Sequence, residues 1–308
     1  MVAQAPDRQG AMSAADVINI ALGIDRAYAP HAAAVIASVT RYAPTAGLRF
    51  VILHDGIEPE LRARVEATAP SARFDWCEIS EADVPAMADR EHFSRAILFR
   101  LGLEKHAPAE CRRMLYLDAD VIVAADVRAL WNLDLGGAPL GAVIDCFVDA
   151  QAFAACWDLP AEAPTYFNSG ILLIDLERVR AERLFAKAID FTLAHIDEIY
   201  LADQDALNFV CWGRWARLDN VWNAQRHMVI PSLIAQTPRE RQLLGRKPAI
   251  IHFTGPEKPW LSEGYHPWSW LYWENLRRTP FFQEVARRYG IGPLKRFMLW
   301  QRHLRRGA

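Results

Sequence analysis

Cysteine is scarce in this sequence and long apolar runs are missing, and both shortages narrow the class of protein. The 308 residues contain five cysteines, an odd number, and no Cys-x-x-Cys pair. Neither a disulfide framework nor a cysteine zinc site is indicated, and a reducing compartment fits best. No segment approaches the ~20 apolar residues of a membrane span, and residues 1–15 lack the apolar core of a signal peptide. We expect a cytoplasmic protein with a disordered leader over residues 1–15.

An excess of positive charge is also missing. The net charge is −2, which gives no overall attraction to nucleic acid. With 52% hydrophobic and 23% charged residues, the composition is that of an ordinary globular protein with a large core. Basic residues cluster only near the C-terminus. No nucleic-acid partner is therefore expected.

The most informative stretch is residues 112–123, in which β-forming apolar residues are interrupted once by Asp118-Ala119-Asp120. It predicts a buried strand whose carboxylates lie where the strand leaves the sheet. Because residues two apart on a strand point to the same side, both carboxylates can converge on one cation. Two hard oxygens favour Mg²⁺ or Mn²⁺. In the alternative, one aspartate caps a turn and the other meets a lysine or arginine.

Strands and helices are expected to alternate around this stretch. Strands are predicted over residues 17–22, 48–53, 73–79, 140–144 and, after an Asn-Ser-Gly turn, up to 176, and helices over residues 29–41, 58–67, 94–105 and 177–197. This spacing implies βαβ units with right-handed crossovers and a mainly parallel sheet. Loops after the strands are where such sheets bind ligands, although the single Gly23 is too little for a dinucleotide fingerprint.

The loop after the first strand contains two candidate ligand-binding residues. Asp25 can accept a hydrogen bond from a base or ribose, and Tyr28 can stack on a base. In the structural alternative, Asp25 caps the following helix and Tyr28 packs against the protein. Arg100, in the buried helix expected over residues 94–105, needs an anion, which is one of the two central aspartates or a phosphate.

Polar residues also stand at the ends of later apolar elements. Asp145 ends the strand over residues 140–144, and Gly170 follows Asn168 where a glycine allows close approach of backbone or ligand. Residues 203–205, Asp-Gln-Asp, fall in the first turn of a helix. The first aspartate fits a cap and the second a dipole partner, which leaves Gln204 unexplained.

A further apolar strand ends at His252. A lone histidine there is usually only hydrogen-bonded, but its imidazole suits Mn²⁺ as a third ligand. The turn set by Gly255 and Pro256 would direct Lys258 back toward the site and onto a phosphate.

The last segment, residues 294–306, is amphipathic when drawn as a helix. Its apolar arc contains Leu294, Phe297, Met298, Trp300 and Leu304, and its basic side contains Lys295, Arg296, Arg302 and Arg306. A short basic helix with tryptophan is typical of a membrane-surface anchor that favours an anionic leaflet. In the alternative, the helix packs on the protein and leaves a solvated basic face.

Taken in order, the motifs of this chain resemble those of glycosyltransferase family 8, the retaining transferases related to glycogenin and to bacterial lipopolysaccharide glucosyl- and galactosyltransferases. The resemblance covers residues 17–262. It rests on Gly23-Ile24-Asp25 with Tyr28, Arg100, Leu-Tyr-Leu-Asp118-Ala-Asp120, Phe-Asn168-Ser-Gly170, Asp203-Gln204-Asp205 with Asn208, and His252-x-x-Gly255-Pro256-x-Lys258-Pro-Trp260.

The resemblance implies a GT-A fold, an α/β domain with a mixed, mainly parallel sheet flanked by helices over residues 16–262. A helical C-terminal extension with a basic amphipathic tail follows over residues 263–308. The sequence departs from the family pattern at Arg26-Ala27, where close relatives often carry Asp-Asn or Lys-Asn, and this removes one expected nucleotide contact.

The resemblance also implies a UDP-sugar donor and Mn²⁺, with Mg²⁺ as the second option. It makes metal ligands of Asp118, Asp120 and His252. It assigns the nucleotide to Asp25, Tyr28 and the Asp118-Ala119-Asp120 stretch, and the diphosphate to Gly255 and Lys258. It assigns the donor sugar to Arg100, Asn168 and Asp203, the space beside the anomeric carbon to Gln204, and the donor sugar or acceptor to Asp145.

The implied activity is retaining transfer of glucose or galactose from the UDP-sugar to a saccharide, on lipopolysaccharide or another glycolipid, at the inner face of a bacterial membrane. Because an amide at Gln204 is a poor nucleophile, we expect front-face substitution without a covalent intermediate. Two alternatives remain: a metal-dependent hydrolase of nucleotides or phosphate esters, in which the Asp-Gln-Asp motif has no role, and a non-catalytic UDP-sugar-binding protein.

Overall fold

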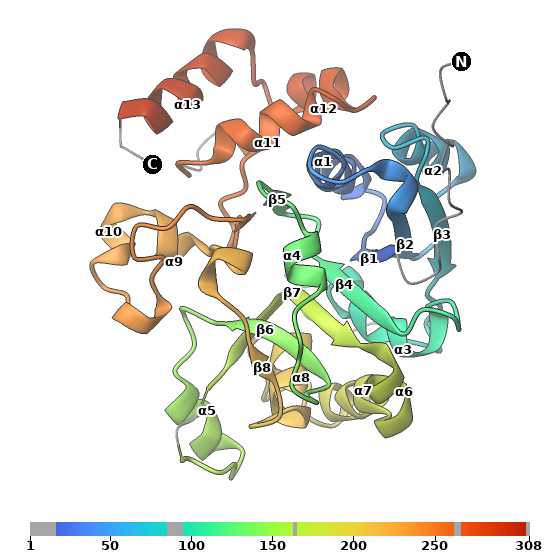
Figure 1. The fold of residues 1–308 in the computed structure, drawn as a ribbon, viewed down its shortest axis with the longest axis vertical. Coiled ribbons are helices and arrows are strands. Elements are labelled where there is room, and N and C mark those ends of the chain that lie inside the picture. Colours follow the sequence, from blue (N-terminus) through green and yellow to red (C-terminus); the bar gives the residue numbers. More distant parts are fainter. Residues whose placement is uncertain (1–16, 85–94, 163–164, 262–265, 306–308) are drawn as a thin grey trace, which may run out of the picture.

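The structure, a computed structural model, describes residues 17–84, 95–162, 165–261 and 266–305. The leader expected over residues 1–15 lies outside the described residues. At the centre is a seven-stranded sheet in the order β3-β2-β1-β4-β7-β6-β8 (Figure 1). Its strands are β1 (Ile18–Gly23), β2 (Leu48–His54), β3 (Arg73–Glu78), β4 (Arg113–Leu117), β6 (Leu140–Ile144), β7 (Phe167–Asp175) and β8 (Ala216–Arg217).

The sheet is mixed and mainly parallel, as the sequence predicted. The pairs β3-β2, β2-β1, β1-β4 and β6-β8 are parallel. Only β7 runs antiparallel, to both β4 and β6. The chain moves outward from β1 to β2 and β3 and then returns to form β4 on the other side of β1. This reversal creates a switch point between β1 and β4, where open α/β sheets bind ligands at the carboxyl ends of the strands.

Side chains that alternate along each strand give the sheet two buried faces. On β1, Ile20 and Leu22 belong to the core shared with one set of helices, whereas Ala21 belongs to the core on the opposite face. Both faces are covered, which explains the nearly continuous apolar strands. The first set of helices is α1 (Ala29–Thr40), α2 (Pro59–Glu66) and α11 (Ser269–Leu276), and the second is α6 (Leu176–Glu182), α7 (Leu184–Ala194) and α8 (Asp203–Val210).

A second, two-stranded sheet joins two distant segments of the chain. β5 (Val121–Val123) pairs antiparallel with β9 (Ile250–His252), and Val121 lies opposite His252. The single strand predicted over residues 112–123 is therefore wrong: it is two strands, β4 and β5, that belong to different sheets. The elements that connect the remaining strands are α4 (Arg128–Trp131), α5 (Ala150–Cys156), η4 (Asn220–Asn223), α9 (Arg226–Val229) and α10 (Pro231–Ile234).

The buried helix predicted over residues 94–105 is mostly a 3₁₀ helix. Its described part consists of η3 (Arg95–Gly102) and one turn of α-helix, α3 (Leu103–His106). The 3₁₀ segment packs closely on its neighbours: a Cβ atom on Gly102 would lie only 2.7 Å from Cδ1 of Ile79. η3 also packs on the end of β1, where a Cβ atom on Gly23 would lie 3.1 Å from Cβ of Phe99.

The long helix predicted over residues 177–197 is also interrupted. Arg183 has a φ of 54°, so the chain turns between α6 and α7. A non-glycine residue in this left-handed region carries no sequence signal, which is why periodicity alone predicted one helix.

Three helices follow the last strand: α11, α12 (Phe282–Arg288) and α13 (Pro293–Arg305), the last drawn in red and set apart from the sheet (Figure 1). On α13 the apolar arc faces solvent, with Leu294, Phe297, Met298 and Trp300 all exposed. The alternative in which the helix packs on the protein is correct in part, because α13 contacts α11 and Trp300 lines a hollow with Trp270 and Trp273, whereas Leu294, Phe297 and Met298 are left to solvent. The side chains of residues 302–306 lie outside the described ones. Among the described helices, none is long and apolar enough to cross a membrane.

Candidate active site

Two aspartates and a histidine meet where the two sheets join. β4 ends at Leu117, and Asp118 and Asp120 belong to the short turn before β5. Strand alternation therefore does not explain their convergence, contrary to the sequence argument. The pairing of β5 with β9 explains it, because this register places His252 beside the turn.

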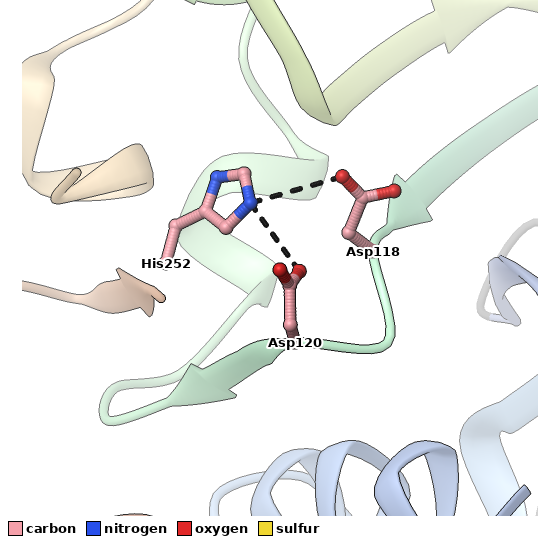
Figure 2. Close-up of side chains that lie close together, drawn as sticks. All are labelled: Asp118, Asp120 and His252. Carbon is pink, nitrogen blue, oxygen red and sulfur yellow. Dashed lines mark ion pairs between the residues drawn. The ribbon is translucent and has the colours of Figure 1, made fainter. Parts of the chain in front are cut away.

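The polar atoms of these three residues lie close enough to share one cation. Nε2 of His252 is 3.3 Å from Oδ1 of Asp120 and 3.7 Å from Oδ2 of Asp118 (Figure 2). The three potential ligand atoms all lie within 4.8 Å of one another. Two carboxylate oxygens and one imidazole nitrogen form a donor set that suits Mn²⁺.

Gly170 forms the wall of this cluster. A Cβ atom there would lie 2.2 Å from Cε1 of His252 and 2.7 Å from Oδ2 of Asp118. Only glycine leaves room for the two side chains, as the sequence argument about close approach predicted. The backbone of Gly170 also accepts a hydrogen bond from the N–H of Asp118 at 2.8 Å. The three ligand candidates and this glycine form one tightly fitted unit.

Two cations hold the outer oxygens of the aspartates. Nη2 of Arg100 lies 2.9 Å from Oδ1 of Asp118, and Nζ of Lys258 lies 2.5 Å from Oδ2 of Asp120. The remaining oxygen of each carboxylate is the one that faces His252. Although burial opposes it, the charge of Lys258 holds the pKa of Asp120 well below its ordinary value. The site is therefore built to keep Asp120 charged.

Arg100 is the buried arginine whose anion the sequence left open. It pairs with Asp118 and also, through Nε at 2.8 Å, with Oδ2 of Asp203. Asp203 is therefore an ion-pair partner and not a helix cap; Ala202 occupies the cap position of α8. Burial raises the pKa of Asp203 to about 7. The positive charge of Arg100, which Asp203 shares with Asp118, lowers this pKa by less than burial raises it.

A second polar group lies on the β7 side of the site. Between Ala142 and Val143 the pairing of β6 with β7 shifts, and residues 169–171 are left out of that ladder. Residues 168–170 are therefore part of β7 at a register irregularity, and the predicted turn is wrong. Such irregularities re-aim side chains next to active sites.

These side chains form a closed hydrogen-bond network. Nδ2 of Asn168 donates to Oδ2 of Asp145 and to Oε1 of Gln204, both at 3.1 Å. Nε2 of Gln204 donates to the same oxygen of Asp145 at 3.2 Å, and Oε1 accepts from the N–H of Ser169 at 3.0 Å. Gln204, which had no structural explanation in the sequence, is thus joined to Asn168 and Asp145.

The neighbouring polar residues of α8 have structural partners. Asp205 accepts hydrogen bonds from the backbone N–H groups of Tyr200 and Leu201 and from the hydroxyl of Tyr166. Asn208 exchanges hydrogen bonds with the backbone of Phe167 at 2.8 and 2.9 Å. These bonds fix α8 against β7 and so hold Gln204 in place.

In this structure Tyr28 packs against the protein, as the structural alternative expects, but Asp25 does not cap α1, because Tyr28 occupies the N-cap position. Oδ1 of Asp25 accepts from the N–H of Tyr28 at 2.9 Å, at the start of α1. The ring of Tyr28 packs edge-on against Trp260, with ring centroids 6.0 Å apart. Gly255 has a φ of 83°, and the turn that it begins returns Lys258 to Asp120. Contact with a nucleotide remains a prediction for these residues.

Two features of the site carried no usable sequence signal. Asn223, which is completely buried, contacts both His252 and Asn168. A cavity of about 400 Å³ has Phe147 in its lining, and the backbone N–H of Phe147 donates to Oδ1 of Asp145. It is lined by aromatic side chains, including Phe147, Trp157 and the exposed Tyr200. A lone polar residue in a loop and scattered aromatic residues are common in any sequence.

Comparison with known proteins agrees with this geometry. The model of Glycosyl transferase family 8 matches residues 19–264. General stress protein A of Bacillus subtilis (strain 168) is 30% identical over 279 residues, which are 86% of this chain and 94% of that protein. The lipopolysaccharide 1,2-glucosyltransferase of Escherichia coli (strain K12) is 25% identical over 279 residues, covering 90% of this chain and 82% of that protein.

A solved structure extends the similarity to three dimensions. The galactosyltransferase LgtC, in complex with donor and acceptor sugar analogs, is 26% identical, with a TM-score of 0.70 over 92% of this chain and 100% of that one. The mixed sheet and the acidic cluster at its switch point define a glycosyltransferase domain of the GT-A fold. The chain belongs to glycosyltransferase family 8, and the protein is an enzyme of that class.

Proposed function

We propose that the protein transfers glucose or galactose from a UDP-sugar to a saccharide, with retention of configuration and with Mn²⁺ held by Asp118, Asp120 and His252. The observation that carries the proposal is the close cluster of these three residues against Gly170, a position that admits no side chain. Mg²⁺ is the second candidate, but the imidazole in the donor set favours Mn²⁺. We further propose that residues 16–262 form the catalytic unit.

The leaving group is proposed to be UDP. A divalent cation at the cluster acts as a Lewis acid on the diphosphate when bound. Lys258, now paired with Asp120, and the backbone N–H of Gly255 supply further stabilisation of negative charge. Asp25, Tyr28 and the Asp118-Ala119-Asp120 turn are proposed to hold the nucleoside.

The donor sugar is proposed to lie against Arg100, Asn168 and Asp203, with Gln204 beside the anomeric carbon. Asp145 and Asp203 are the two carboxylates on this side. The carboxylate of Asp145 accepts four protein N–H donors, and that of Asp203 is paired with Arg100 and the Ser169 hydroxyl. Both oxygens of Asp145 are thus engaged by donors, whereas the two contacts of Asp203 both use Oδ2. The side chain proposed to lie beside the anomeric carbon, Gln204, is an amide and a poor nucleophile.

We therefore propose front-face substitution. The bond between the anomeric carbon and the phosphate oxygen breaks as the acceptor oxygen bonds to the same face. The acceptor proton passes to the departing phosphate oxygen, so no covalent enzyme intermediate forms. Isolation of a glycosyl adduct on Asp203 or Asp145 would contradict this mechanism.

The acceptor is proposed to be an oligosaccharide of lipopolysaccharide or another glycolipid, reached from the cytoplasm. The similarity to a lipopolysaccharide 1,2-glucosyltransferase supports this class. The cavity lined by Phe147, Trp157 and Tyr200 offers flat surfaces on which sugar rings can pack. The exposed apolar arc of α13, residues 294–300, supports contact with the inner face of a membrane, and the five free cysteines suit a reducing compartment.

The two alternative functions receive less support. Family membership argues against a phosphate-ester hydrolase, in which the network around Gln204 would have no role. A non-catalytic binding protein would not require the cluster of Asp118, Asp120 and His252.

The test is turnover of a panel of UDP-sugars by the purified protein in Mn²⁺, with and without saccharide acceptors. We expect one UDP-hexose to be hydrolysed slowly without acceptor and Asp120→Asn to reduce that rate at least about a hundredfold, because the cation contributes several kcal/mol. Asp126→Asn is the matched control, since Asp126 lies six residues further on and, within the described part of the chain, forms its ion pair with Arg128. Cleavage of simple phosphate esters without cleavage of any UDP-sugar would contradict the proposal.

A further inference from the structure

Asn223 connects the two polar groups of the site. It is the last residue of η4 and is completely buried. Its Oδ1 lies 3.0 Å from Nδ1 of His252, and its Nδ2 donates to Oδ1 of Asn168 at 2.8 Å. One amide thus contacts a candidate metal ligand at one end and a candidate sugar ligand at the other.

The direction of these hydrogen bonds is fixed by two groups that contact Asn168. The backbone N–H of Gly170 can only donate, and it donates to Oδ1 of Asn168 at 3.1 Å. At the other end of the same amide, Nδ2 of Asn168 donates a hydrogen bond to Oδ2 of Asp145, a carboxylate oxygen that can only accept. Two independent groups therefore require the same orientation of Asn168.

The orientation of Asn168 determines that of Asn223. Because Oδ1 of Asn168 is an acceptor, the group that faces it must be the NH₂ of Asn223. The oxygen of Asn223 then faces Nδ1 of His252, which must carry the proton. In the neutral imidazole Nε2 then keeps its lone pair, and Nε2 is the atom that faces Asp118 and Asp120.

We propose that Asn223 is a positioning residue that holds His252 in the Nδ1–H tautomer and thereby sets the affinity of the site for a divalent cation. The inference rests on the proposed metal site. Partners of this kind orient metal-bound histidines, and their loss typically lowers metal affinity 10–100-fold. Asn223 itself touches neither the cation nor the substrate.

Three variants separate this role from simple structural support. Asn223→Ala removes the acceptor for Nδ1 of His252. Asn223→Asp keeps that acceptor and loses only the donor to Asn168. Asn220→Ala is the matched control, because Asn220 is a buried asparagine of the same segment that donates to the carbonyls of Glu240 and Gln242, both at 3.0 Å.

The first readout is Mn²⁺ affinity of the full chain, measured by electron paramagnetic resonance without any sugar nucleotide. We expect Asn223→Ala to bind Mn²⁺ 10–100-fold more weakly than the wild type. Asn223→Asp is expected to stay within about threefold of the wild type or to bind more tightly, since a carboxylate also accepts from Nδ1. Asn220→Ala should bind as the wild type does. Wild-type affinity in Asn223→Ala, or an equal loss in Asn220→Ala, would overturn the inference.

The second readout needs no metal. The ¹⁵N shifts of the His252 imidazole, at about pH 8 where a free imidazole is neutral, report which nitrogen is protonated. We expect the Nδ1–H form in the wild type and in Asn223→Asp, and a mixture in Asn223→Ala. An Nε2–H form in the wild type would overturn the inference even if Asn223→Ala did not fold. A wild type that binds no Mn²⁺ would contradict the proposed metal site, while the tautomer would still decide the role of Asn223.

Discussion

Single residues set the geometry of this active site through the space that they leave. Gly170 lies in β7 at the register irregularity, where its missing side chain makes room for His252 and Asp118. Its carbonyl and its N–H are both used, by Asp118 and Asn168. The glycine therefore contributes both its backbone groups and the absence of a Cβ atom.

We expect Gly170→Ala to lose Mn²⁺ binding and turnover while the fold persists. The added methyl would lie 2.2 Å from Cε1 of His252, so the histidine or the strand must move. The overpacking should lower the free energy of unfolding by about 1–3 kcal/mol. Thermal unfolding and Mn²⁺ titration measure the two effects. Gly292→Ala is the control, because a Cβ there has no neighbour within 4 Å; an unchanged Mn²⁺ affinity in Gly170→Ala would disprove the role of the glycine.

At the scale of elements, the ends of strands carry the polar groups that matter. The turn after β4, the last residue of β9 and the irregular start of β7 supply the cluster. β2 shows the same arrangement in a structural role. Its last residue, His54, is fully buried, and its Nδ1 accepts from the backbone N–H groups of Gly56 and Ile57 at 3.0 and 3.2 Å.

We expect His54 to make stability depend on pH. Burial, assisted by Arg62, lowers the pKa of His54 to about 4, below the ordinary value of 6.5. Between these two pKa values His54 is protonated in the unfolded chain but not in the folded chain. Its contribution to the free energy of unfolding is therefore fully present above about pH 6.5 and is lost as the pH falls toward 4. His54→Asn keeps an acceptor without a titrating group. Urea unfolding at pH 7 and pH 5 should show a smaller loss in the variant than in the wild type, and parallel losses would refute the assignment.

At the scale of the whole molecule, the C-terminal helices serve both the core and the surface. α11 packs on α1, where His31 stacks on Trp260 at 3.6 Å and bonds to the Tyr272 hydroxyl at 2.7 Å. α13 instead turns its apolar residues outward. Leu294 is 68% exposed and Phe297 is 49% exposed, beside the cationic Lys295 and Arg296. An apolar arc flanked by cations matches the chemistry of an anionic lipid surface.

We expect Phe297→Glu to weaken binding to vesicles of anionic phospholipid at least about tenfold, because burial of a phenyl ring contributes about 1.5–3 kcal/mol. Co-flotation of the purified protein with vesicles measures this binding. Leu244→Glu is the control, since Leu244 is also exposed, at 56%, but lies outside α13. Equal flotation of Phe297→Glu and the wild type would remove the membrane from the proposed function.

Local patterns predicted most of the central sheet. The strand expected over residues 140–144 matches β6, and those expected at 17–22 and 48–53 are each displaced or extended by one residue. Apolar runs succeed here because both faces of the sheet are covered. The patterns failed at Arg183 and at residues 168–170, where partners distant in the sequence determine the local conformation.

The sequence by itself determined the family, the mixed α/β sheet and most of the polar residues of the candidate site, because strand-forming runs and ordered motifs are local properties of a chain. Only the tertiary structure decided how these residues are used. The pairing of β5 with β9 brings His252 to the aspartates, and the register shift in β7 places Gly170 against them. Asn223 connects His252 to Asn168. These contacts join residues far apart in the chain, and their geometry depends on strand register and close packing, which no single segment encodes.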